Sequence, residues 1–154
     1  MEQQVSIINF DVQYTADFKR LNLEWLDKYE LTEEADLLML DYPQREILDT
    51  GGVIFLAKVG EAIAGSAALI QEIEGEFELA KMSVSIDFQG KGISKLLLEK
   101  CLEEGTKLGA TKIYLVSNSK LTTALSLYEK YGFKHVPVIH NHYSNADVRM
   151  ELLM

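Results

Sequence analysis

The feature that most constrains this chain is residues 78–94, an apolar strand that runs through a glycine-spaced turn into a helix. The turn, residues 89–94, reads QGKGIS. A helix begins with backbone N–H groups that have no partner inside the helix, and its dipole is positive at that end. Glycine lets an anion approach these groups closely because it carries no Cβ. The segment therefore predicts a strand–turn–helix unit whose helix start binds a phosphate or pyrophosphate.

Hydrophobic periodicity around this unit predicts a mixed sheet covered by helices. The strands are expected over residues 5–9, 53–59, 62–71, 77–86, 112–117, 133–139 and 147–153. The helices are expected over residues 15–30, 32–40, 92–108 and 121–131, with a short helical turn at 44–48. The first strands should form an antiparallel meander, and the crossover through 92–108 should join two parallel strands. The fold class is thus α/β (α+β), in a single domain over residues 1–154.

Composition narrows the partners of this domain. The formal net charge is −9, with 24 acidic residues against 15 lysines and arginines. Because nucleic acids are bound by clustered lysine and arginine, nucleic acid is not expected as a partner. The stretch from 24 to 49 is rich in acid, and only Lys28 and Arg45 oppose it. We interpret this acidic segment as a solvated helix face, and the alternative is an acidic mouth that attracts a cationic substrate.

The chain carries few signals for a membrane, a disulfide or a metal. No apolar run approaches the length of a membrane span and no secretory signal is evident, so we expect a cytoplasmic protein without a membrane contact. Cys101 is the only cysteine, which excludes an internal disulfide and a cysteine-based zinc cluster. Its place on the inner stripe of a helix indicates packing. His140 and His142 lack a clear third ligand, so no metal is expected.

Two motifs give the chain a resemblance to a known family. Residues 89–94 resemble the acetyl-CoA signature of the GNAT superfamily of acyl-CoA-dependent N-acetyltransferases, with Ser94 where that signature has glycine or alanine. Residues 125–133 (LSLYEKYGF) resemble a C-terminal helix segment of that family, and residues 79–84 (LAKMSV) resemble the strand before the signature in small bacterial members. The resemblance implies a GNAT-like mixed, mostly antiparallel sheet of six or seven strands, with helices on both faces.

The resemblance also assigns residues to acetyl-CoA. The amides of residues 90–94 would cradle the pyrophosphate, with charge added by Lys91 or Lys95. The pantetheine arm would lie along the strand at Met82 and Val84, and this strand would splay from the strand at 112–118 to admit it. The residues implied in cofactor binding are Met82, Val84, Gln89, Gly90, Lys91, Gly92, Ile93, Ser94, Lys95, Asn118 and Tyr128.

Acetyl transfer to an amine needs a proton acceptor, a donor to the oxyanion and a proton source for the leaving thiolate. By resemblance, the oxyanion donor is the backbone N–H of Met82, and the proton source is the hydroxyl of Tyr128. Glu78 matches the position of the catalytic glutamate in members that acetylate protein lysines. Strict strand alternation places Glu78 on the same face as Met82 and Val84, unless a bulge intervenes. A water chain or Tyr143 is the alternative base.

Three kinds of function stay open at this point. The intact motifs favour an enzyme that moves an acetyl group from acetyl-CoA to a primary amine by direct attack in a ternary complex. A non-catalytic acyl-CoA-binding sensor or regulatory module would bind the cofactor without transfer, and a structural domain would bind none. In those alternatives Tyr128 only packs its helix on the sheet, and Glu78 pairs with a lysine. The acceptor is open between a small molecule and a protein amine, with the acidic segment mildly favouring a cationic small molecule, and a homodimer is also open.

Overall fold

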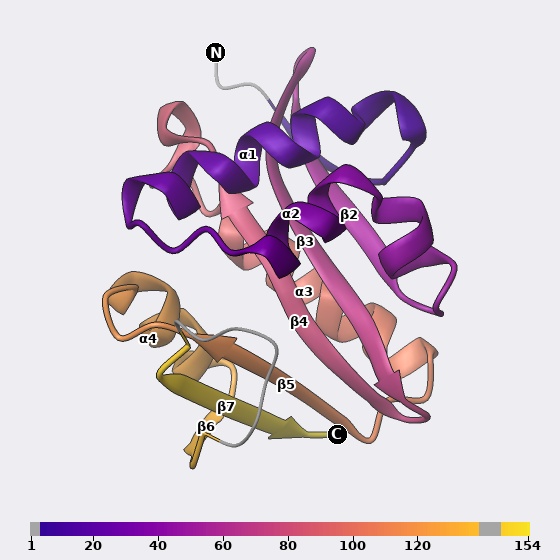
Figure 1. Cartoon of the computed structure of the whole chain (residues 1–154), viewed down its shortest axis with the longest axis vertical. Coiled ribbons are helices and arrows are strands. Elements are labelled where there is room, and N and C mark those ends of the chain that lie inside the picture. Colours follow the sequence, from indigo (N-terminus) through magenta and orange to yellow (C-terminus); the bar gives the residue numbers. More distant parts are fainter. Residues whose placement is uncertain (1–3, 139–145) are drawn as a thin grey trace.

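The apolar segments form one twisted sheet in the computed structural model, which describes residues 4–138 and 146–154 (Figure 1). Its strands run in the order β1-β2-β3-β4-β5-β7-β6, and the β4–β5 pair is parallel while the other pairs are antiparallel. The strands are β1 Val5–Asn9, β2 Val53–Val59, β3 Ala62–Ile73, β4 Glu76–Val84, β5 Lys112–Ser117, β6 Lys134–Val136 and β7 Val148–Leu153. The expected α/β fold class, with a mixed, mostly antiparallel sheet of six or seven strands, is confirmed, and the described residues form seven strands.

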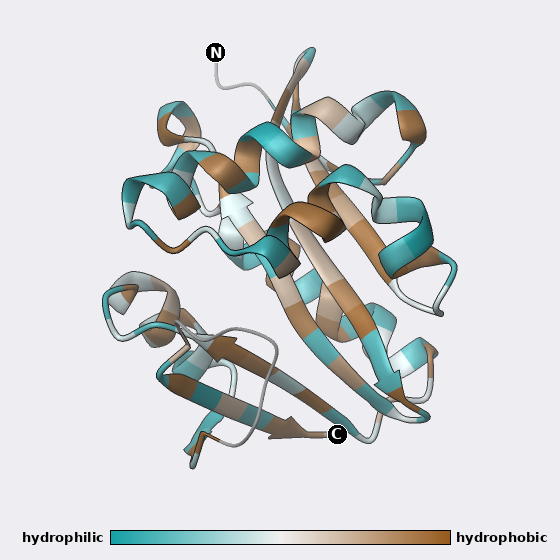
Figure 2. Cartoon of the chain, in the orientation of Figure 1, coloured by the Kyte–Doolittle hydropathy of each residue, from teal (hydrophilic) through white to brown (hydrophobic). Residues whose placement is uncertain are grey.

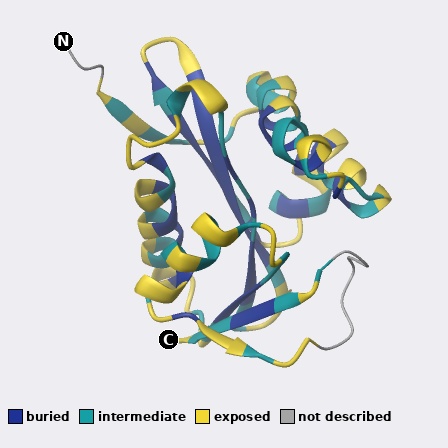
Figure 3. Cartoon of the chain, turned by 90° about the vertical axis from the view of Figure 1, so that its left-hand side faces the viewer, coloured by how far each residue is buried: buried dark blue, intermediate teal, exposed yellow. Residues whose placement is uncertain are grey.

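Helices cover both faces of this sheet. The helices are α1 Thr15–Lys28, α2 Glu34–Asp41, α3 Ile93–Lys107 and α4 Thr122–Lys130, with single helical turns at Val12–Tyr14, Gln44–Leu48 and Ile86–Phe88. One apolar cluster joins α1 and α2 to the sheet, and a second joins α3 and α4 to its other face. Figure 2 shows the hydrophobic bands along the strands, and Figure 3 shows the buried strands between the two layers of helices.

The start of α1 and the length of the sixth strand are set by local hydrogen bonding. Thr15 does not cap α1: its Oγ1 donates to Val12 O at 2.7 Å, and Asp11 instead accepts from Gln13 N to begin a 3-10 turn that leads into the helix. The sixth strand is Lys134–Val136 and not 133–139, because Pro137 follows and has no N–H to donate to a ladder. Neither feature alters the packing of the helices on the sheet.

A bulge and a splay interrupt the sheet at β4. The pairing of β3 with β4 shifts between Ser66 and Ala68, so that one residue of β3 lies opposite two of β4. The parallel pairing of β4 with β5 covers only Glu76–Glu78 and Lys112–Tyr114. Beyond these residues the two strands separate, which confirms the splay that the family resemblance implied. The gap exposes β4 backbone groups that would otherwise be paired.

Among residues 4–138 and 146–154, no helix is both long enough and apolar enough to cross a membrane.

Candidate active site

The turn before α3 is open to an approaching anion. Gly90 and Gly92 have φ values of +77° and +78°, and a Cβ built on either would meet no atom within 4 Å. Gly92 is the N-cap of α3, so the helix begins directly behind this open backbone. Lys91 and Lys95 are both exposed beside it. The arrangement fits a pyrophosphate, since free amides, the helix dipole and two ammonium groups meet where no side chain blocks the approach.

The side chain of Gln89 orients the other end of this turn. Its Nε2 donates to the carbonyl of Val84 at 3.2 Å, which ties the turn to the last residue of β4. The backbone N–H of Ile86 donates to Glu24 Oε1 of α1 at 2.7 Å. The turn that would hold an anion is therefore anchored on both β4 and α1.

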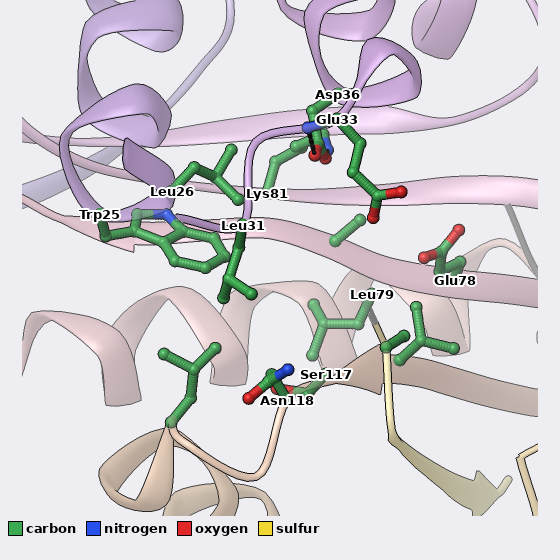
Figure 4. A pocket seen from close by; sticks show the side chains of 14 residues that line it. Trp25, Leu26, Leu31, Glu33, Asp36, Glu78, Leu79, Lys81, Ser117 and Asn118 are labelled. Carbon is green, nitrogen blue, oxygen red and sulfur yellow. Dashed lines mark hydrogen bonds and ion pairs between the residues drawn. The ribbon is translucent and has the colours of Figure 1, made fainter. Parts of the chain in front are cut away.

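A pocket that is open to solvent lies where β4 and β5 separate (Figure 4). Its walls come from the end of α1, the start of α2, β4, β5 and the segment that follows β5. The lining residues are Trp25, Leu26, Leu31, Glu33, Asp36, Glu78, Leu79, Ala80, Lys81, Val116, Ser117, Asn118, Leu121 and Ala146. The walls are thus mostly apolar, with charged groups gathered on the side of α2 and β4.

Glu78 is a buried carboxyl in the wall of this pocket. Its residue is 3% exposed and lies opposite Tyr114 in the parallel register of β4 and β5. Burial raises the pKa of Glu78 from 4.5 to about 7, and the ammonium of Lys81 opposes this rise. Near neutral pH this carboxyl therefore exchanges readily between its acid and base forms, which suits a group that transfers protons.

The expectation that Glu78 shares a face with Met82 and Val84 is wrong. Glu78 and Ala80 face the α1–α2 side, whereas Met82 and Val84 pack against the α3 cluster. The reason is the bulge, because Ala80 and Lys81 are consecutive yet both face α1 and α2. The side chains of Glu78 and Met82 thus lie on opposite faces of the sheet, where β4 separates from β5.

Tyr128 comes from α4 and reaches the α3 side of the same gap. It is 8% exposed, and its hydroxyl lies 3.7 Å from Met82 Sδ. Its ring packs edge to face on Phe133 with centroids 5.9 Å apart. Burial raises the pKa of the Tyr128 hydroxyl, so the group stays protonated unless a strong base forms beside it. The side chain therefore both packs α4 and brings a proton donor to Met82.

Asn118 follows β5 and lines the pocket opposite the α1–α2 wall. Its Oδ1 accepts from the backbone N–H of Lys120 at 3.0 Å. The next residue, Ser119, donates from its N–H and its hydroxyl to Asp147, both at 2.8 Å. The loop that carries Asn118 is therefore tied down to the start of β7.

Sequence reasoning missed most of the residues that line this pocket, among them Trp25, Asp36 and Lys81. Lys81 is buried and its Nζ lies 2.5 Å from Asp36 Oδ1. A lysine between the apolar residues Ala80 and Met82 of a strand is a readable signal, because a buried ammonium requires a partner. The partner could not be read, since Asp36 lies far away in the sequence among other acidic residues.

Most acidic residues of the segment 24–49 are engaged in ion pairs or hydrogen bonds within the fold. Asp36 pairs with Lys81, Asp41 with Lys19 and Glu46 with Arg45. Of its acidic residues, Glu33 and Asp36 line the pocket. The segment is thus mainly a helix face, and only its two pocket residues bear on a bound molecule.

The remaining sequence candidates contribute little to the site. Cys101 is buried, and burial raises the pKa of its thiol to about 12, so it stays a neutral packing group. His140, His142 and Tyr143 lie outside the described residues. In the described part of the chain, no three His, Cys, Asp or Glu residues come together as a metal site would require.

Solved structures define the class of this fold. An acetyltransferase of the GNAT family from Staphylococcus aureus Mu50 superimposes with a TM-score of 0.87 at 22% identity, over 96% of this chain and 98% of that one. The PaiA N-acetyltransferase of Thermoplasma acidophilum, solved in complex with coenzyme A, gives a TM-score of 0.77 at 18% identity, over 98% and 99% of the two chains. The fold is therefore that of CoA-dependent acetyltransferases.

Sequence comparison gives the family. The sequence model of the acetyltransferase (GNAT) family matches residues 17–133. The uncharacterized N-acetyltransferase YvbK of Bacillus subtilis is 31% identical over 129 residues, which are 79% of this chain and 83% of that protein. The ribosomal protein bS18-alanine N-acetyltransferase of Escherichia coli K12 is 29% identical over 87 residues, 56% and 59% of the two chains. The chain belongs to the GNAT family and is an acyl-CoA N-acyltransferase.

Proposed function

We propose that this chain moves an acetyl group from acetyl-CoA to a primary amine by direct attack in a ternary complex. The observation that carries the proposal is the gap between β4 and β5, which joins two different environments. On the α3 side lies the open helix start behind Gly92. On the α1–α2 side lies the pocket that contains Glu78. A thioester held in the gap would thus be within reach of an amine from the other face.

Residues on the α3 side would hold acetyl-CoA. The amides of residues 90–94 and the ammonium groups of Lys91 and Lys95 suit the pyrophosphate. The splayed edge of β4 at Met82 and Val84 offers backbone groups to the pantetheine amides, as an added strand would use them. Asn118, which lines the pocket across the gap from β4, would bond the same arm. Gln89 would act indirectly, by fixing the turn through Val84.

Glu78 would remove the proton from the acceptor. An ammonium has no lone pair, so the amine must be neutral when it attacks. A carboxylate whose pKa is about 7 is a stronger base than an ordinary glutamate, and at neutral pH a large fraction of it is ionised. Glu78 takes one proton from the bound ammonium, directly or through one water, and the neutral amine then attacks to form the C–N bond. The surplus proton left on that nitrogen restores the Tyr128 hydroxyl after Tyr128 has protonated the leaving thiolate.

Met82 would stabilise the oxyanion, and Tyr128 would protonate the leaving thiolate. The backbone N–H of Met82 would donate to the thioester oxygen as that oxygen becomes negative. When the C–S bond breaks, the thiolate takes the proton of the Tyr128 hydroxyl, which lies beside the Met82 side chain. The products are then an N-acetylated amine and coenzyme A with a free thiol.

The pocket indicates the character of the acceptor. Glu33 and Glu78 would attract an ammonium, and Trp25 and Leu31 form an apolar wall beside them. This combination favours an amine on an apolar body over a long polycation. Acetylation of an alanine of ribosomal protein bS18 belongs to the E. coli relative and does not define the acceptor of this chain.

A panel of amines with acetyl-CoA, followed by release of free thiol, tests the proposed function. We expect at least one amine to support turnover, with arylalkyl and alkyl amines ahead of polyamines. Glu78→Gln should lower kcat/KM for that amine by roughly 100-fold at pH 7, the usual contribution of a general base. Saturable CoA binding without transfer to any amine would instead favour a cofactor-binding sensor.

A further inference from the structure

Lys81 has an unusual backbone conformation for a lysine. Its φ is +53°, in the left-handed region that glycine adopts readily and lysine does not. It sits at the bulge where β4 passes Ser66 and Ala68 of β3. The bulge turns the side chain of Met82 to the α3 face and leaves that of Glu78 on the α1–α2 face. A strained lysine therefore occupies the bulge that separates Glu78, on the α1–α2 face, from Met82, on the α3 face.

Both ends of Lys81 are held by buried polar groups. Its carbonyl accepts from Ser66 Oγ at 2.7 Å, and Ser66 in turn accepts from Asn22 Nδ2 of α1 at 3.1 Å. Its ammonium reaches Asp36 of α2. All four residues are buried. The bulge is thus fixed by a polar chain that runs from α1 through β3 and β4 to α2.

Fold stability alone does not account for this arrangement. A glycine at the bulge would relieve the left-handed strain, and replacing a buried ion pair by apolar residues is often neutral or stabilising. Here the ion pair lines the same pocket as Glu78, on the same side of β4 (Figure 4). This location indicates that the ion pair affects the protonation of Glu78.

We propose that Lys81 and Asp36 form a positioning pair, which holds the β4 bulge in place and sets the electric field at Glu78 for proton removal from the acceptor amine. This inference rests on the proposed function, because it assigns a role to neighbours of the proposed base. Neither residue transfers a proton itself.

The two members of the pair act on Glu78 with opposite signs. The ammonium of Lys81 stabilises the ionised carboxylate and lowers the pKa of Glu78, while Asp36 raises it. The other described charged or titratable groups around Glu78 are Glu33 before α2, Glu72 on β3, Tyr114 on β5 and Arg149 on β7. Asp36 thus limits how far Lys81 can pull the Glu78 pKa back toward that of an exposed glutamate.

The test is an NMR titration of Glu78 in the intact chain, labelled with ¹³C at glutamate carboxyl carbons and assigned through Glu78→Gln. The midpoint should lie near pH 7 in the parent chain. In Lys81→Met it should rise, and in Asp36→Asn it should fall, each by roughly one pH unit, the size that a neighbouring charge produces. Asp41→Asn is the matched control, because Asp41 lies on the same helix and pairs with Lys19 on the surface.

Opposite shifts in the two variants, with the Asp41→Asn midpoint unchanged, would support the pair. Shifts in the same direction, or none, would overturn it, since a purely structural pair gives no sign difference. If Asp36→Asn does not fold, Lys81→Met/Asp36→Leu removes both charges, and its midpoint must still rise, because Lys81 is the stronger influence.

A second measurement separates this inference from the proposed function. The acidic limb of kcat/KM against pH, with the best amine of the panel, should move with the NMR midpoint in each variant. A limb that stays in place while the midpoints move would overturn the role in proton removal. If no amine in the panel is acetylated, the proposed function fails, while the midpoints still show whether the pair controls the charge of Glu78.

Discussion

Burial raises the pKa of Glu78 to about 7, so the ionised form that the proposed reaction needs is also the form that burial disfavours. The folded chain binds this proton more tightly than the unfolded chain, whose carboxyl titrates near 4.5. The resulting contribution to folding is fully present below pH 4.5 and is lost as the pH rises through about 7. An ionised Glu78 therefore makes the folded chain less stable at neutral and alkaline pH.

The first prediction concerns the loss of folding stability when Glu78 is ionised. Glu78→Gln keeps the shape of the side chain and removes its charge, so it should raise the free energy of unfolding at pH 8 by up to about 3 kcal/mol. The gain should disappear toward pH 4.5, where both side chains are neutral in the folded state. Urea unfolding of both chains at pH 5 and pH 8 measures it. An equal difference at the two pH values would contradict the raised pKa.

The second prediction concerns Tyr128. Tyr128→Phe retains the ring that packs on Phe133 and removes the hydroxyl beside Met82. We expect kcat to fall by roughly 100-fold, while the Kd for coenzyme A changes little, because the hydroxyl acts when the thiolate leaves. Tyr131→Phe is the control, since the Tyr131 hydroxyl donates to Glu99 near the surface. Equal kcat values for the two variants would remove the proton-donor role.

At the scale of elements, the two ends of α3 carry a matched pair of glycines. Gly92 and Gly109 lie at opposite ends of the helix, both with φ of +78° and with no atom within 4 Å of a built Cβ. Alanine at either position is strained by about 1 kcal/mol, so the two variants should lose similar stability. Only Gly92→Ala places a methyl group where the pyrophosphate would lie.

The third prediction follows from this pair. The Kd for coenzyme A should rise by roughly tenfold or more in Gly92→Ala, equivalent to about 1.4 kcal/mol, and should stay within twofold in Gly109→Ala. Isothermal titration calorimetry measures both. If the two variants bound coenzyme A equally well, the anion site would have to lie elsewhere on the chain.

The elements also show how far the sequence could be read. The strand, turn and helix of residues 78–94 follow from apolar spacing and two glycines, because these signals are local. The bulge could not be predicted from the sequence, because residues 79–84 (LAKMSV) contain no glycine or asparagine to mark a left-handed residue. The φ of +53° at Lys81 is instead stabilised by the contacts that Lys81 makes with Ser66 and Asp36. The side on which Glu78 lies was wrongly predicted for that reason alone.

At the scale of the whole molecule, the sheet would separate the two binding sites that the proposed function requires. Coenzyme A would enter from the α3 side and the acceptor from the α1–α2 side, so both can be bound at once. Cys101 offers no covalent route, because burial raises its thiol pKa to about 12 and it packs among apolar residues of the α3 face. The geometry therefore favours direct transfer over an acyl-enzyme.

The fourth prediction is kinetic. Initial rates with acetyl-CoA and amine varied together should give intersecting double-reciprocal lines, as expected when both substrates are bound before reaction. Incubation with radiolabelled acetyl-CoA in the absence of amine should leave no label on the denatured chain. Parallel lines together with labelled protein would indicate a covalent intermediate and contradict direct attack.

The most direct test of the cofactor site is a titration of the ¹⁵N-labelled chain with coenzyme A, followed through its backbone amide signals. We predict that the largest shifts fall on residues 90–94 and on Met82 and Val84, and that the amides of β1, at the far edge of the sheet, stay in place. Saturating shifts confined to other elements, or no shifts at millimolar coenzyme A, would show that the gap between β4 and β5 does not hold the acetyl donor.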